Sequence, residues 1–173
     1  MMLTVLDRDG ELIGLGCDIL FLMKLFDIVK YLVIFVFAHI VTYFFAGFIA
    51  KALGVFDFYP PSPTAISYLR NPASAYVWAH MFPAQISRSL LYAVALLPVF
   101  GLIREQNQFK GGLIIGSIIF LVGYVAASGG LIEHTVFFTE YPLRFALISL
   151  VEISIQAFLF GQAVMALTRK YID

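Results

Sequence analysis

The sequence predicts an all-α membrane protein: a single integral membrane domain over residues 1–173 with four transmembrane helices in a bundle. A short N-terminal β-hairpin and an interfacial segment before the second helix complete the expected fold. The first supporting observation is composition, because 61% of the residues are hydrophobic and only 13% are charged. A soluble domain carries about 25% charged residues, so this chain has too few to cover a soluble surface. The second observation is a set of long apolar runs separated by polar or proline-rich segments.

Charge and cysteine content exclude several classes of protein. Lys and Arg total 11 and Asp and Glu total 11, which removes the electrostatic basis for nucleic-acid binding. Cys17 is the only cysteine in the sequence, which excludes an intrachain disulfide and a multi-cysteine metal site. The acidic residues Asp7, Asp9 and Glu11 disfavour a cleaved signal peptide. We therefore expect the mature chain to begin where the sequence does.

The N-terminal residues predict a hairpin followed by the first transmembrane helix. Two short apolar runs flank an Asp-Gly pair at Asp9 and Gly10, a pattern typical of a hairpin turn. After an interfacial lead-in, an apolar run extends from about Ile28 to Leu53. This run exceeds the roughly 20 residues that a helix needs to cross a bilayer.

The remaining segments alternate between loops and apolar runs. Residues 56–72 are rich in proline and turn-forming residues and are not expected to cross the membrane. Residues 73–82 contain Tyr76 and Trp78, and aromatic residues gather at the headgroup level, so we expect a short interfacial segment there. Pro83 is then expected to open the second helix. The later transmembrane helices are predicted at about 84–103, 111–128 and 143–167.

The distribution of basic residues predicts the orientation. With the N-terminus inside, the inner side would hold Arg8, Lys24, Lys30, Arg104, Lys110, Arg169 and Lys170. The outer side would hold Lys51, Arg70, Arg88 and Arg144. Basic residues concentrate in cytoplasmic loops, so this distribution favours a multi-pass cell-membrane protein with both termini in the cytoplasm. The segment 129–144, between the last two helices, then faces outward.

Small and polar residues follow one face of the first predicted helix. The residues of this stripe are separated by three or four positions, as helical periodicity requires: His39, Thr42, Tyr43, Ala46, Gly47 and Ala50. Phenylalanines occupy the other faces: Phe35, Phe37, Phe44, Phe45 and Phe48. Small residues mark helix interfaces in membranes, so we expect the stripe to face other helices and the phenylalanines to face lipid.

His39 and Glu152 are ionisable residues predicted at mid-membrane. Each lies about nine residues, or roughly 13 Å, inside its helix. Tyr43 shares the stripe of His39, and Gln156 shares that of Glu152. The functional hypothesis is a ligand or ion site made of these four residues, in which His39 and Glu152 meet. The alternative is that each side chain is satisfied locally and only stabilises helix packing.

A second candidate site is the outer rim, where polar residues lie near the helix ends: His80, Arg88, Glu133, His134 and Arg144. The functional hypothesis is a pocket for a small anion, a headgroup or a metal. The alternative is a solvated rim in which the two arginines pair with Glu133 or Glu140. Adjacent Glu133 and His134 point apart on a helix or a strand, and no HExxH spacing occurs, so no metal site is predicted. Neither His80 nor His134 has a sequence context typical of haem ligation.

The sequence predicts no catalytic residue and no cofactor. It contains no GxSxG nucleophile elbow and no Walker or Rossmann glycine pattern. In the third predicted helix, Gly112 and Gly116 form a small-xxx-small pair, which is typical of close helix packing.

The last helix resembles a pattern found in multi-pass membrane proteins of bacteria and archaea whose activity is uncharacterised. That pattern has Pro-x-x-Arg at the helix start, a Glu eight residues after the Arg, and a later Phe-x-x-Gly. Within residues 141–167 the matching positions are Pro142, Arg144, Glu152, Phe158 and Gly161. The chain departs from the pattern because Arg144 follows Pro142 by two positions. The resemblance implies a membrane bundle whose last helix carries an Arg and a Glu, and it implies no activity.

These observations favour a non-enzymatic integral membrane protein that acts as a binding or accessory subunit. Its expected partners are the lipid bilayer and either a second copy of the chain or other membrane subunits. One alternative is an ion- or proton-coupled transporter or channel that uses His39 and Glu152. Another is a small membrane enzyme that acts on a lipid or quinone at the outer rim.

Overall fold

The computed structural model of the chain is helical, and it describes residues 5–6, 12–13, 25–66, 69–125 and 142–172. The long helices are α2 (Leu25–Ala52), α3 (Ala75–Arg104), α4 (Gln108–Phe120) and α6 (Leu143–Tyr171). Two short helical turns follow α2 and α4, namely the 3₁₀ turn η1 (Val55–Phe58) and the π-helical turn η2 (Leu121–Val125). The bounds of α2 and α6 lie within a few residues of those predicted for the first and last transmembrane helices.

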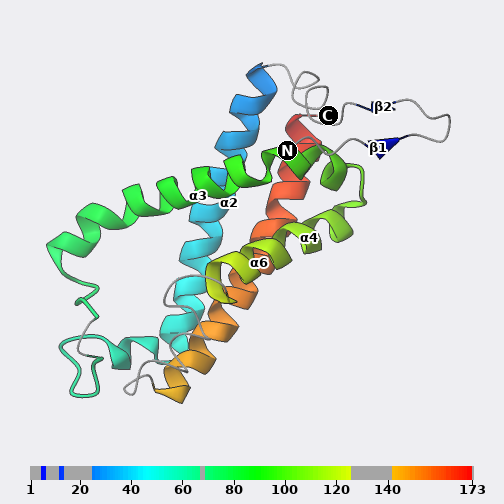
Figure 1. The fold of residues 1–173 in the computed structure, drawn as a ribbon. Helices are drawn as coiled ribbons and strands as arrows, with labels where there is room; N and C mark the ends of the chain where they lie inside the picture. The colour runs from blue at the N-terminus through cyan, green and yellow to red at the C-terminus, as the bar shows by residue number, and fades with distance from the viewer. Residues whose placement is uncertain (1–4, 7–11, 14–24, 67–68, 126–141, 173) are drawn as a thin grey trace.

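The helix α6 packs against both α2 and α4, and α3 crosses α2 steeply (Figure 1). The start of α2 meets the end of α6, where Lys30 Nζ donates a hydrogen bond to the Tyr171 carbonyl at 3.0 Å. At the other end of α6, the Tyr124 hydroxyl of η2 donates to the Ala146 carbonyl at 3.0 Å. The helix α6 therefore runs antiparallel to both α2 and α4. The first half of α3 extends away from α4 and α6 (Figure 1).

An aromatic cluster contributed by α2, α3 and α6 forms the centre of the core. The fully buried Phe35 ring lies 4.5 Å from the Tyr31 ring, 6.2 Å from Phe100 and 5.4 Å from Phe160, measured between ring centres. The buried Tyr31 hydroxyl donates to a backbone carbonyl of α3 at 2.9 Å. The expectation that Phe35 faces lipid is therefore wrong. Phe35 lies one helical turn before His39, which places it on the same packed stripe.

Glycines allow the backbones of α4 and α6 to come into direct contact. A Cβ atom on Gly161 would overlap the Gly112 carbonyl oxygen and would lie 2.8 Å from the Gly116 nitrogen. A Cβ on Gly116 would lie 2.7 Å from the Ala157 carbonyl oxygen. The small-xxx-small pair of α4 thus lies against a third glycine on α6, which is the geometry expected of close helix packing in a membrane.

The helix α3 is continuous through Pro83, and this corrects the expected start of the second helix. The Ser74 side chain caps the helix by accepting a hydrogen bond from the Val77 backbone nitrogen at 3.3 Å. Residues 73–82 therefore do not form a separate interfacial segment before a helix at 84–103, because most of them are the first turns of α3. An internal proline removes one backbone hydrogen bond, and membrane helices tolerate this loss.

Three of the helices, α2, α3 and α6, are long and apolar enough to cross a membrane, judged by length and composition. The described part of the third predicted span is a shorter apolar helix over Gln108–Tyr124, and residues 126–128 lie outside the described part. Large apolar side chains cover the outside of α2, where Phe37 and Phe45 are 58% and 53% exposed. These exposed phenylalanines fit a lipid-facing surface, as the sequence predicts.

The N-terminal region contains two very short strands, β1 (Val5–Leu6) and β2 (Leu12–Ile13). They pair antiparallel, with Val5 opposite Ile13. The Asp-Gly turn between them lies outside the described residues. Two paired residues on each side do not establish the predicted hairpin.

Candidate functional site

A cavity of about 490 Å³ lies between the second half of α2, the first turns of α3 and the loop that joins them. Glu152 is the residue of α6 that lines the cavity, and Tyr43 of α2 lines it as well. Tyr59, Arg70 and Trp78 contribute further side chains. The steep crossing of α2 and α3 (Figure 1) keeps the first half of α3 away from α6. The cavity occupies the region between them.

Glu152 projects toward this cavity without a polar partner in the described part of the chain. It forms neither a hydrogen bond nor an ion pair with any residue that the structure describes. Its charge nevertheless acts on two neighbouring tyrosines, Tyr43 and Tyr59. Burial raises the pKa of Tyr59, and the nearby Glu152 carboxylate raises this pKa further because it disfavours a second negative charge. Glu152 is thus a half-buried carboxyl group beside two phenols.

His39 is held by α3 rather than by Glu152. It is only 3% exposed, and its Nε2 lies 3.0 Å from Gln85 Oε1. Its other ring nitrogen, Nδ1, is buried and has no hydrogen-bond partner within the described residues. The structure shows no hydrogen bond or ion pair between His39 and Glu152, because the His39 ring faces Gln85 and the Phe160 ring, whose centre is 5.7 Å away.

Tyr43 lies between the histidine and the carboxyl group. Its ring is nearly parallel to that of His39, with the ring centres 6.4 Å apart, and it interacts with the Gln85 side chain. It also lines the cavity together with Glu152. The structure therefore brings Tyr43 and Glu152 to one cavity and places His39 behind Tyr43. Gln156, one turn after Glu152 on α6, is half-buried and does not line the cavity.

The edge of the cavity carries a stack of three side chains from the loop and α3. The Arg70 guanidinium carbon lies 4.2 Å from the centre of the Tyr76 ring. The His80 ring stacks on the same Tyr76 ring, with 4.1 Å between the two ring centres. His80 Nδ1 also lies 2.8 Å from the Tyr76 carbonyl oxygen. Arg70 therefore interacts with an aromatic face and with no described carboxylate.

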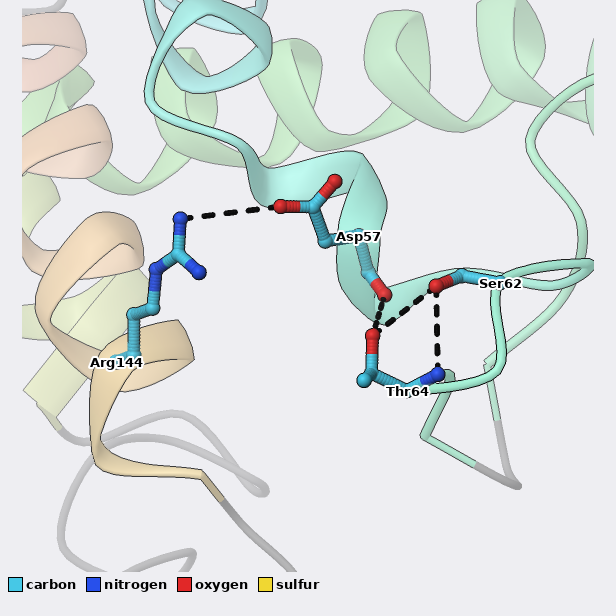
Figure 2. Close-up of polar contacts among 4 residues, drawn as sticks. All are labelled: Asp57, Ser62, Thr64 and Arg144. Carbon is cyan, nitrogen blue, oxygen red and sulfur yellow. Dashed lines mark hydrogen bonds and ion pairs between the residues drawn. The ribbon is translucent and has the colours of Figure 1, made fainter.

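Arg144 pairs with a residue that the sequence analysis did not consider. Its Nη2 lies 3.8 Å from Asp57 Oδ2, and both side chains are exposed (Figure 2). The Thr64 hydroxyl donates to the Asp57 carbonyl at 2.6 Å and lies 3.0 Å from the Ser62 hydroxyl, which ties the loop to η1. Gly54, with a φ of 82°, turns the chain from α2 into η1 and brings Asp57 toward Arg144.

The predicted outer-rim residues occupy separate places. Arg144 is with Asp57 and His80 is with Tyr76, while Arg88 is exposed on α3 and its charge acts on His39 and Tyr43. Glu133, His134 and Glu140 lie outside the described residues. Within the described ranges no group of three His, Cys, Asp or Glu side chains could hold a metal ion.

Several residues that line the cavity or lie beside it were not predicted from the sequence. Gln85 carried one signal, because it shares a helical stripe with Ser89, and both are buried on the face of α3 that meets α2. No sequence signal identifies Tyr59 and Arg70, because their positions depend on how the proline-rich loop folds back over α2. Trp78 was expected at the membrane interface, and the structure places it on the cavity wall.

Comparison with known proteins returns no family model, no curated protein and no solved structure that matches this chain. The resemblance of residues 141–167 to other multi-pass proteins thus has no support from these comparisons.

Proposed function

We propose that this chain is a non-enzymatic integral membrane protein that binds a ligand in the cavity between α2, α3 and α6. The observation that carries the proposal is the position of Glu152. Its carboxyl group faces a cavity of about 490 Å³, within the range typical of small-molecule sites, and it has no ion-pair or hydrogen-bond partner among the described residues.

The alternative of a purely structural Glu152 has less support. A polar side chain that stabilises helix packing in a membrane does so by bonding to a neighbouring helix. His39 fits that description, since it bonds to Gln85 across α2 and α3. Glu152 does not, since it makes no such bond with the described residues. An ionisable group at membrane depth is costly to keep unless it contributes to function, which supports a binding role for Glu152.

The experiment compares the wild type with Glu152→Gln after both are extracted directly into lipid nanodiscs. Small molecules that remain bound are identified by mass spectrometry. Glu105→Gln is the matched control, because Glu105 is an exposed carboxylate at the far end of α3. We expect a molecule that is retained by the wild type and the control and is depleted in Glu152→Gln. Equal retention by all three proteins would contradict the proposal. A Glu152→Gln protein that retains the same bound molecules and has only a lower melting temperature would also contradict it.

An ion- or proton-coupled carrier is the second candidate, and two observations favour it. Among the described residues Glu152 is unpaired, and the buried ring nitrogen Nδ1 of His39 has no hydrogen-bond partner. Four helices leave little room for alternating access within one chain, so a carrier would have to be a dimer or have partner subunits. In proteoliposomes, Glu152→Gln should abolish proton flux while the protein remains folded. An outer-rim enzyme would instead tolerate Glu152→Gln and fail with His134→Ala or Arg144→Ala.

We further propose four membrane crossings, with the third made by α4, η2 and the residues up to about 128. The 18 residues from Gln108 to Val125 extend about 27 Å as a helix, close to the roughly 30 Å of the hydrocarbon core. The contact between Lys30 and Tyr171 supports a topology in which the start of α2 and the end of α6 share one side of the membrane, and the basic residues favour the cytoplasm for that side. The N-terminal hairpin would rest there. Reporter fusions after residues 107 and 173 test this topology, since both should report the cytoplasm.

A further inference from the structure

We infer that the cavity binds an organic cation with an apolar body, such as a hydrophobic amine or a quaternary ammonium compound. This inference rests on the proposed binding function and names its ligand class. It depends on two features of the cavity wall: the aromatic side chains and the position of the charged groups.

Aromatic rings dominate the cavity wall. The rings belong to Tyr43, Phe44, Phe48, Phe56, Tyr59 and Trp78. The face of an aromatic ring attracts a cation, and rings arranged around a quaternary ammonium group are a known mode of recognition. The same rings bury the apolar body of a ligand. An anion would meet the negative faces of these rings and would gain nothing from them.

The charged groups of the cavity differ in burial, and this difference decides the sign of the ligand charge. Glu152 is half-buried, whereas Lys51 and Arg70 are exposed. Water and salt screen the two exposed cations. At equal distance, a charge in an environment with a dielectric constant near 20 interacts about four times more strongly than one in bulk water. The half-buried carboxylate therefore outweighs the exposed cations in the interior of the cavity.

The two basic residues at the edge of the cavity, Arg70 and Lys51, either contact another side chain or extend into water. Arg70 lies over the Tyr76 ring, and the exposed Lys51 is at the end of α2, where a long side chain extends to the water phase. Neither residue pairs with a described carboxylate. Among the described residues Glu152 is the acidic group that lines the cavity and has no polar partner, and a ligand cation would supply one.

The experiment uses three probes with the same six-carbon chain: hexyltrimethylammonium, 1-hexanol and hexanesulfonate. The sequence contains a single tryptophan, and Trp78 lines the cavity, so its fluorescence reports binding directly. The protein is held in nanodiscs of zwitterionic lipid, which do not concentrate either ion at their surface. Trp78→Phe shows any signal that does not come from the site.

We expect hexyltrimethylammonium to bind at least tenfold more tightly than hexanesulfonate, with 1-hexanol between them. Glu152→Gln should weaken binding of the cation at least tenfold and leave 1-hexanol unchanged. Glu105→Gln should bind all three probes as the wild type does. Glu152→Asp, which keeps the charge, should retain the preference for the cation, and this variant separates loss of charge from loss of folding.

The outcomes that overturn the inference differ from those that overturn the binding function. Tighter binding of hexanesulfonate, lost in Lys51→Gln or Arg70→Gln, would assign the cavity to an anion and leave the binding function in place. Equal binding of all three probes would show an apolar pocket without charge selection. If no probe binds and no molecule is retained in the nanodiscs, the proposed binding function fails together with the inference.

Discussion

Replacing Gly161 by alanine tests the contact between α4 and α6. The new methyl group would overlap the Gly112 carbonyl oxygen and would lie 2.8 Å from the Gly116 nitrogen. Both neighbours are backbone atoms, so no side-chain rotation relieves the overlap and the two helices must separate. Overpacking typically costs about 1–3 kcal/mol, and a backbone clash lies at the upper end. Alanine regains about 1 kcal/mol in helix propensity. The net loss in the free energy of unfolding is therefore about 2 kcal/mol.

The matched control for this prediction is Gly47→Ala on α2. A Cβ at Gly47 meets nothing within 4 Å, so only the gain in helix propensity remains, about 1 kcal/mol. For a chain of this size 1 kcal/mol shifts the melting temperature by about 2–4 °C. Thermal unfolding in nanodiscs should show Gly161→Ala about 4–8 °C below the wild type and Gly47→Ala at or slightly above it. A Gly161→Ala protein as stable as Gly47→Ala would refute the close approach of the two helices.

Two further predictions concern the loop that closes the cavity. Gly54→Ala should destabilise the protein by about 1–2 kcal/mol, because Gly54 has a φ of 82°. Its Cβ would also lie 2.9 Å from Asp57 Oδ2 and 3.0 Å from Arg144 Nη2. Chemical denaturation measures this loss, and an unchanged midpoint would show that the turn relaxes. Burial and the Glu152 carboxylate raise the pKa of Tyr59 above its ordinary value of 10.0, so the folded state holds this proton more tightly than the unfolded state. Stability from this group is complete below pH 10 and is lost as the pH rises further. Tyr59→Phe should flatten the stability profile above pH 10, and an unaltered slope would contradict the assignment.

The sequence predicted the features that depend on helical periodicity. On the α2 stripe, His39, Thr42, Ala46 and Ala50 are buried, and Phe37 and Phe45 are exposed on other faces, because helical periodicity separates these faces. The rest of the prediction is not met, since Tyr43 and Gly47 of the stripe and the predicted lipid-facing Phe44 and Phe48 line the cavity. The same reasoning placed Glu152 on a stripe with Gln156. Phe35 contradicts the predicted lipid-facing set, because it lies one turn before His39 on the packed stripe and is fully buried.

The features that depend on how the loops fold could not be predicted in the same way. Gly54 has a positive φ that turns the chain and brings Asp57 to Arg144, a residue 87 positions later in the sequence (144 − 57). No local pattern encodes that contact. Proline favours the first turn of a helix, so the sequence predicts a helix start at Pro83. This prediction is wrong, because the Ser74 cap begins the helix earlier. The neighbours of Glu152 in the cavity depend on both the turn at Gly54 and the early start of α3.

The meeting of α2 and α6 has a consequence for how the chain is made. Lys30 and Tyr171, 141 positions apart, are joined at 3.0 Å, and Phe35 packs against Phe160. During synthesis the first long helix enters the membrane well before its final neighbour has left the ribosome. Until then the packed face of α2, including the polar His39, has α3 but not α6 as a partner. Nascent chains halted before α6 should therefore be recognised by membrane quality control, and the last helix should act as the step that commits the chain to its mature form.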